Sequence, residues 1–171
     1  MKKHFFLKSS FGFTLIEMII VIGIMGIIAT VGSGAFFSIL KGSLKAKTMR
    51  IVKQNGDYAL SVMERMIRNA RVLVEPTSSS TASSITIKNP DGGITTFSCE
   101  NGTIASNGAS LISSNVMVEN CSDIFTVVIG KQGVTPSSVK INFNLKQSSE
   151  NVRLEEKASI NFQTSVGLRN Y

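Results

Sequence analysis

The stretch that decides the fold is GFTLIEMIIVIGIMGIIATVGSGAFFSIL, residues 12–40. From Phe13 to Leu40 it contains 28 residues and one charged side chain, that of Glu17. At about 1.5 Å per residue, a helix of this length reaches about 42 Å, more than the hydrocarbon core of a bilayer, which is about 30 Å thick. The stretch therefore predicts a membrane-spanning helix near the start of the chain.

The segment ahead of this helix is short and basic, because residues 1–12 carry Lys2, Lys3 and Lys8. An ordinary secretory signal places its cleavage site after the apolar run, behind small residues. Here the basic segment leads directly into a long apolar run. Residues 1–12 are therefore interpreted as a leader that precedes a retained anchor.

Glu17 is the anomaly of the apolar run. An acidic side chain at mid-bilayer costs about 2.5–3.5 kcal/mol on insertion scales. Cleavage between Gly12 and Phe13 would create a positively charged amino terminus four residues before this carboxylate. The amino terminus of a neighbouring copy, shifted along a filament axis, would then lie beside Glu17. Attraction between opposite charges in a low dielectric would set the register of the subunits.

The segment GFTLIE, Gly12 to Glu17, resembles the cleavage and methylation signature of type IV pilins and type II secretion pseudopilins. The resemblance implies that a membrane peptidase and methyltransferase cuts after Gly12 and methylates Phe13, and that Glu17 guides incorporation. It also implies other pilins, an inner-membrane assembly platform and membrane lipid as partners. The implied location is the cytoplasmic membrane, crossed once, with the leader in the cytoplasm and the head outside, before extraction into a pilus or pseudopilus.

Two features of the anchor concern helix packing. Many major pilins interrupt this helix with a proline, whereas here Gly32 and Gly34 occupy its second half, and glycine loosens a helix without breaking it. Small residues recur at every fourth position and let membrane helices approach closely, although glycine is also common in membrane helices generally. The members of this stripe are Gly26, Thr30, Gly34, Ser38 and Gly42.

The helix is predicted to continue as an amphipathic segment over residues 41–75. Its first turns are basic, which is typical of a juxtamembrane cluster at lipid headgroups, and an i,i+4 pair joins Glu64 to Arg68 on the outer side. The pattern stops at Glu75-Pro76, so the helix is expected to run from Phe13 to about Val74. The basic residues are Lys41, Lys45, Lys47 and Arg50, and the apolar stripe comprises Val52, Gly56, Ala59, Met63, Met66, Ala70 and Leu73.

Residues 76–171 are predicted to form a β-rich head, so the fold class is α+β with the second half of the helix packed on an antiparallel sheet. A Ser/Thr-rich run over residues 78–84 suggests a linker, and Pro90-Asp91-Gly92-Gly93 suggests the turn of the first hairpin. Period-two alternation marks the candidate strands. These are residues 85–88, 94–98, 102–105, 115–118, 124–129, 139–145 and 152–162.

Cys99 and Cys121 lie in the segment that would be exported, where an oxidising compartment permits a disulfide. We favour a disulfide over free thiols, and both over metal binding, because no C-x-x-C is present and the single histidine, His4, lies in the leader. The weaker alternative of a calcium site rests on the two carboxylates that flank Cys121, those of Glu119 and Asp123.

Catalysis has few candidate residues. Removal of the leader would leave no histidine, and the chain has no G-x-S-x-G, P-loop or paired metal-ligand motif, so neither an enzyme nor a cofactor is expected. Glu155 and Glu156 are adjacent, so on a strand they would point to opposite faces, which disfavours an acid/base pair.

The net charge of +7 falls to +4 without the leader, since 15 basic residues then face 11 acidic ones, and they are scattered. Nucleic acid is therefore disfavoured as a partner without being eliminated. The helix segment Met63 to Ala70 and the tail pattern Val166-x-Leu168-Arg169-Asn170 resemble J-type pseudopilins and W-type pilins. We thus expect a structural subunit of a filament, and a minor subunit rather than the major one. The alternative is a binding module carried on the filament, either an adhesin or a DNA-uptake pilin.

Overall fold

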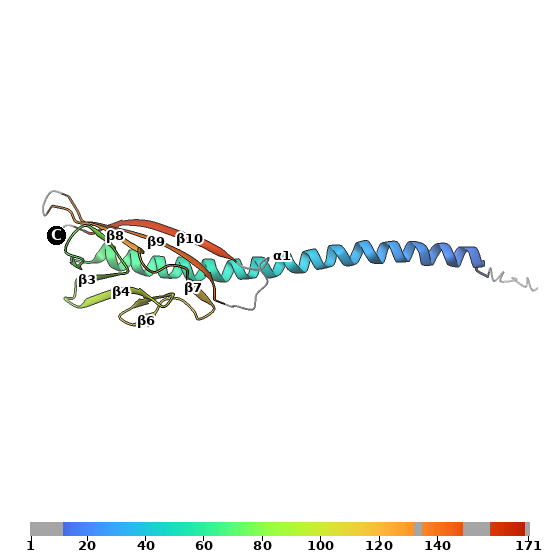
Figure 1. Cartoon of the computed structure of the whole chain (residues 1–171), viewed down its shortest axis with the longest axis horizontal. Coiled ribbons are helices and arrows are strands. Elements are labelled where there is room, and N and C mark those ends of the chain that lie inside the picture. Colours follow the sequence, from blue (N-terminus) through green and yellow to red (C-terminus); the bar gives the residue numbers. More distant parts are fainter. Residues whose placement is uncertain (1–11, 132–134, 149–157, 170–171) are drawn as a thin grey trace, which may run out of the picture. The chain divides into compact units, whose positions relative to one another are not determined.

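A computed structural model describes residues 12–131, 135–148 and 158–169. The chain divides into two compact units, Met1–Gly42 and Ser43–Tyr171. One helix, α1 (Leu15–Asn69), supplies the helical residues described in the first unit and the opening residues of the second (Figure 1). In the first unit, α1 exposes its apolar side chains, for example Ile27 at 66%. By length and composition alone α1 could cross a membrane, with a mean hydropathy of 2.4 in its most apolar window.

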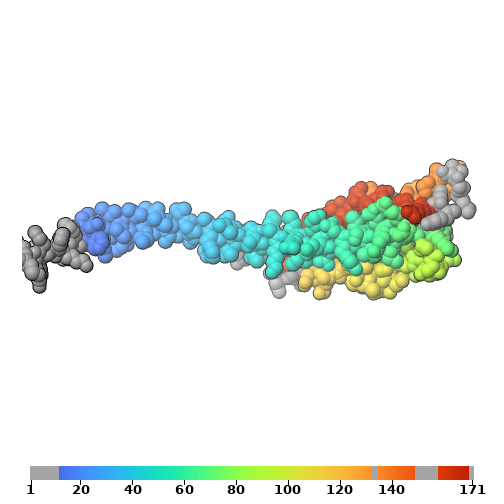
Figure 2. Space-filling model, turned by 180° about the vertical axis from the view of Figure 1, so that it is seen from behind, coloured from blue at the N-terminus to red at the C-terminus, as the bar shows by residue number. Residues whose placement is uncertain are grey.

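In the second unit, α1 buries a stripe of side chains with the spacing predicted from the sequence. Val52, Gly56, Ala59 and Met63 of the predicted stripe are buried, and so is Ile67, whereas Met66 is only half-buried. Figure 1 and Figure 2 both show this part of α1 between β10, on one side, and the strands around β6 and β7 on the other. The predicted amphipathic helix is therefore confirmed over this range, and it forms one layer of the head.

The predicted end of the helix, near Val74, is wrong. The helix ends at Asn69, and the N–H of Arg71 donates to the carbonyl of Lys88 at 2.8 Å. Residues 72–75 then form strand β1 (Val72–Glu75), which pairs with β3 (Ser84–Lys88). Valine at 72 and 74 favours a strand, and β3 supplies pairing partners for Val72, Leu73 and Glu75, with a bulge at Val74. Pairing with residues far along the chain thus overrides the helical spacing at Leu73.

The first sheet has the order β1-β3-β4-β5-β6 and is antiparallel throughout. The turn predicted at Pro90 to Gly93 joins β3 to β4, with the N–H of Gly92 donating to the carbonyl of Asn89 at 3.1 Å. Gly92 has φ of +88°, a backbone conformation that other residues rarely adopt. The remaining strands of this sheet are β4 (Ile94–Glu100), β5 (Thr103–Ser106) and β6 (Ala109–Ser110).

The second sheet has the order β10-β9-β8-β2, and β7 also pairs with β9. Its strands are β2 (Ser80–Ala82), β7 (Val116–Val118), β8 (Phe125–Val128), β9 (Ser138–Gln147) and β10 (Ser159–Gly167). Two predictions need correction. The expected linker at 78–84 contains β2, because its backbone pairs with β8. The last strand extends to Gly167, past its predicted end at Phe162, while residues 152–157 lie outside the described residues.

The core of the head gathers side chains from α1 and both sheets. The rings of Phe143 and Phe162 stack with centroids 5.4 Å apart. The backbone of α1 at Gly56 approaches Phe162 so closely that an added Cβ would lie 2.1 Å from the Cζ atom of the ring. A hydrogen bond also joins α1 to the loop at Ser113, because Oδ1 of Asn55 accepts the N–H of Ser113 at 2.8 Å. The predicted α+β class, with a helix packed on antiparallel sheets, is confirmed.

Candidate functional site

The start of α1 contains the residues that the sequence singled out for processing. Gly12, Phe13 and Thr14 precede the helix and have no regular secondary structure. All three are exposed, Phe13 at 77%. The bond between Gly12 and Phe13 therefore lies outside the helical hydrogen-bond network, two residues before the helix starts at Leu15. Residues 1–11 of the predicted leader lie outside the described residues.

Thr14 caps the helix, a role that the sequence analysis missed. Its Oγ1 accepts the N–H of Glu17 at 3.3 Å, and its carbonyl accepts the N–H of Met18 at 3.2 Å. A threonine that accepts a hydrogen bond from the residue three positions on is the first half of a capping box, whose second half is an acidic residue at that position. The spacing Thr14-x-x-Glu17 was the available signal. Such a cap contributes about 1 kcal/mol to helix stability.

Glu17 occupies the first turn of α1 and is exposed. A carboxylate there is favoured by the partial positive charge of the helix amino terminus, an effect of about 0.3–1 kcal/mol. Among the described residues, its side chain takes part in none of the ion pairs, which join Lys53 to Asp57, Arg68 to Glu64 and Lys146 to Glu119.

The stripe of small residues lies on α1 within the first unit. A Cβ added at Gly26 or Gly34 would meet no atom within 4 Å. Thr30 satisfies its hydroxyl within the helix, because Oγ1 donates to the carbonyl of Ile27 at 2.8 Å. Ser38, like these three, is exposed. Within the described chain the stripe is thus uncovered and presents a surface low enough for another helix to approach.

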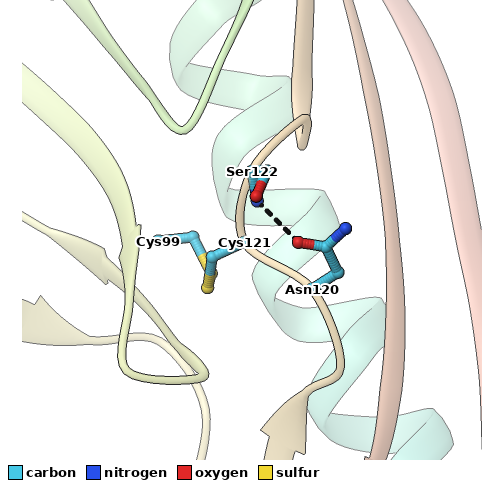
Figure 3. The surroundings of a disulfide bond; sticks show 4 residues. All are labelled: Cys99, Asn120, Cys121 and Ser122. Atoms are coloured by element: carbon cyan, nitrogen blue, oxygen red, sulfur yellow. Dashed lines mark hydrogen bonds between the residues drawn. A yellow bond between two sulfur atoms is a disulfide. The ribbon is translucent and has the colours of Figure 1, made fainter.

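Cys99 and Cys121 form a disulfide in the structure (Figure 3). Cys99 is buried in β4, and Cys121 lies between β7 and β8, 22 residues further along the chain, with 5.3 Å between the Cα atoms. Beside the bond, Oδ1 of Asn120 accepts the N–H of Ser122 at 3.0 Å, which orders the loop (Figure 3). The bond therefore links the first sheet to the segment that leads into β8 of the second.

The acidic residues do not assemble a metal site in the described part of the chain, where no three His, Cys, Asp or Glu side chains cluster suitably. Glu119 and Asp123 line one shallow hollow together with asparagines. Glu119 pairs instead with Lys146, at 3.6 Å. Glu155 and Glu156 lie outside the described residues.

The two segments that resemble minor pilins have structural roles where they are described. Met63 and Ile67 are core residues of α1, and an ion pair joins Glu64 to Arg68 on its outer side. In the tail, Val166 and Leu168 are buried at the end of β10. Both segments therefore contribute buried side chains to the core of the head, and Asn170 lies outside the described residues.

Comparison with known families finds one match, which covers residues 7–33 and is described as the prokaryotic N-terminal methylation motif. Searches of curated proteins and of solved structures found no significant match. The matched range includes Gly12, Phe13 and Glu17 and most of the apolar run. The motif and the arrangement of a long amino-terminal helix followed by a β-sheet head therefore agree with one another.

Proposed function

We propose that this type IV pilin-like protein, with its methylation motif ahead of a long helix and a β-sheet head, is a non-enzymatic filament subunit cleaved between Gly12 and Phe13. The observation that carries the proposal is the position of the motif relative to the helix. Its expected cleavage site falls in the short non-helical stretch immediately before α1, where the backbone is exposed.

Cleavage is the step that makes the subunit competent for assembly. A prepilin peptidase would release the leader with Lys2, Lys3 and Lys8 and leave Phe13 as the amino terminus, which the same enzyme would methylate. The new ammonium group would carry a positive charge four residues before Glu17. The ammonium group of one subunit would pair with the Glu17 carboxylate of its neighbour. Without such a partner, a carboxylate at mid-bilayer costs about 2.5–3.5 kcal/mol.

The apolar part of α1 holds the subunit before and after assembly. Before assembly it would span the cytoplasmic membrane once, in contact with lipid, with the head outside. An assembly platform in that membrane would then extract it into a pilus or pseudopilus. In the filament, the stripe formed by Gly26, Thr30, Gly34 and Ser38 would face the helices of other pilins, which replace lipid as the apolar surroundings.

We further propose that the protein is a minor subunit of the filament. The head has two sheets of several short strands and a disulfide, and the α1 and β10 segments have the patterns that resemble J-type and W-type subunits. This head is larger than that of a minimal pseudopilin, which suits a position that few subunits occupy, such as the filament tip. Copy number per filament, measured by quantitative mass spectrometry, would separate a minor from a major subunit.

The proposal is tested by blocking the cut. Gly12→Ile places a branched side chain beside the scissile bond, and we expect the variant to keep its leader, remain in the membrane fraction and be absent from sheared filaments. Gly32→Ala is the matched control, since it changes a glycine of the same segment away from the bond and should be processed and assembled normally. Normal filament incorporation of the uncut Gly12→Ile protein would overturn the proposal.

A further inference from the structure

A hollow of about 430 Å³ opens in the head where three segments from distant parts of the sequence meet. It is lined by residues at the start of β1 and just after it, by described residues between β8 and β9, and by the two residues that follow β10. Its volume lies within the range of about 300–1,000 Å³ that is typical of small-molecule sites. None of the roles discussed above uses this hollow.

Two arginines line the hollow, and both are held in place through the backbone. Arg71 donates its N–H to the carbonyl of Lys88 at 2.8 Å, and the residue before Arg169, the buried Leu168, donates its N–H to the carbonyl of Ser137 at 2.9 Å. Both arginine residues are exposed. Within the described residues neither guanidinium belongs to an ion pair, and the lining contains no carboxylate.

Two hydroxyl groups add donors to the same lining. The Oγ of Ser137 accepts the N–H of Gly130 at 3.1 Å, and Oγ1 of Thr135 accepts the N–H of Lys131 at 2.9 Å. Because each oxygen accepts a backbone N–H, its own hydroxyl proton remains to be donated. The polar groups of the hollow thus offer donors and positive charge, which suits an oxyanion.

The rest of the lining is apolar. Val72, Pro76 and Ile129 contribute side chains to it, and Val72 is half exposed. A fully hydrated ion such as phosphate gains nothing from these surfaces, whereas an organic molecule can cover them. Guanidinium groups bind carboxylates through paired N–H donors. Among the described residues the lining has no aromatic side chain on which a nucleic acid base could stack.

We propose that this hollow binds a small organic carboxylate, of which a hexuronic acid unit is an example, through Arg71 and Arg169. The carboxylate would lie against the two guanidinium groups, with sugar hydroxyls near Ser137 and Thr135 and the ring against the apolar lining. All its described lining residues belong to the head.

The test uses the full chain in zwitterionic detergent micelles and D-glucuronate as the probe. Side-chain Nε–H resonances of Arg71 and Arg169, followed by ¹⁵N NMR, should shift on titration, whereas D-glucose should shift neither and inorganic phosphate should bind more weakly. Absence of any shift in both resonances with glucuronate would overturn the proposal. So would equal binding of glucose or of phosphate.

Variants locate the site. Arg71→Gln and Arg169→Gln should each weaken glucuronate binding by about tenfold, the scale of one charge-assisted hydrogen bond. The control is Arg65→Gln, which removes the same charge from an exposed arginine of α1 outside the hollow and should leave binding unchanged. Equal weakening by Arg65→Gln would show attraction to net charge alone and contradict the assignment. Where a variant misfolds, the titration of the unmodified chain still decides.

Discussion

At the scale of a single residue, the charge of Glu17 has two opposite effects. In the first turn of α1 it favours the helix, since a carboxylate complements the amino-terminal end and Thr14 accepts its N–H. In a membrane the same charge is costly. The proposed cut after Gly12 reconciles the two effects by supplying a positive terminus from another subunit.

We predict that Glu17→Gln separates processing from assembly. The variant keeps the shape of the side chain and loses its charge, so the cut after Gly12 should proceed while incorporation into filaments falls strongly. Glu17→Asp, the control, keeps the charge and should retain more incorporation. The measurement is the ratio of processed protein in sheared filaments to that in membranes. Wild-type incorporation of Glu17→Gln would contradict the pairing of this residue with the terminus.

At the scale of elements, the contact between α1 and β10 depends on the absence of a side chain at Gly56. An alanine there would place its Cβ 2.1 Å from the Phe162 ring, so the helix or the ring must move. We predict that Gly56→Ala destabilises the head by about 1–3 kcal/mol, the usual cost of overpacking. Urea unfolding of the full chain in micelles, followed by far-UV circular dichroism, measures the change.

The matched control for this contact is a double-mutant cycle with Phe162→Leu. The smaller side chain leaves a cavity alone but makes room for the alanine, so the two destabilisations should sum to more than that of the double variant. Strict additivity would show that the close approach of Gly56 to the ring does not limit the packing.

The small-residue stripe gives a second prediction for α1. A Cβ added at Gly26 or Gly34 meets no atom within 4 Å, so Gly26→Leu and Gly34→Leu should leave membrane insertion and the stability of the head unchanged. In a filament they would hold neighbouring helices apart, and incorporation should fall. Gly32→Leu, at a glycine on the opposite face of the same helix, is the control. Unchanged incorporation of both stripe variants would refute the proposed packing face.

How far the sequence predicts these elements depends on whether the deciding contacts are local. The buried stripe from Val52 to Met63 could be predicted because its spacing belongs to one helix. The helix end at Asn69 could not be predicted, because the helical spacing of apolar residues continues to Leu73. Only the pairing of β1 with β3 shows that residues 72–75 form a strand. β2 was missed for the same reason, because it depends on pairing with β8. The Thr14 cap is local, so the sequence could have predicted it. The hollow containing Arg71 and Arg169 arises only in three dimensions.

At the scale of the whole molecule, the disulfide between Cys99 and Cys121 ties the two sheets of the head together through the loop before β8. In the chain-entropy model, a closed loop of this length contributes about 3 kcal/mol. We predict that Cys99→Ser with Cys121→Ser lowers the free energy of unfolding by about that amount, without affecting cleavage of the leader. Reduction of the unmodified protein is the control and should give the same loss. An unchanged unfolding midpoint would show that the bond does not stabilise the head.

The chain as a whole has an anchor whose surface is apolar and a head with its own core, and the cut after Gly12 is proposed to convert the first from a membrane span into a filament core. The most direct measurement of this claim is the intact mass of the protein recovered from sheared filaments. We predict a chain that begins at Phe13 and carries one added methyl group. Filament-borne protein that still begins at Met1 would contradict it.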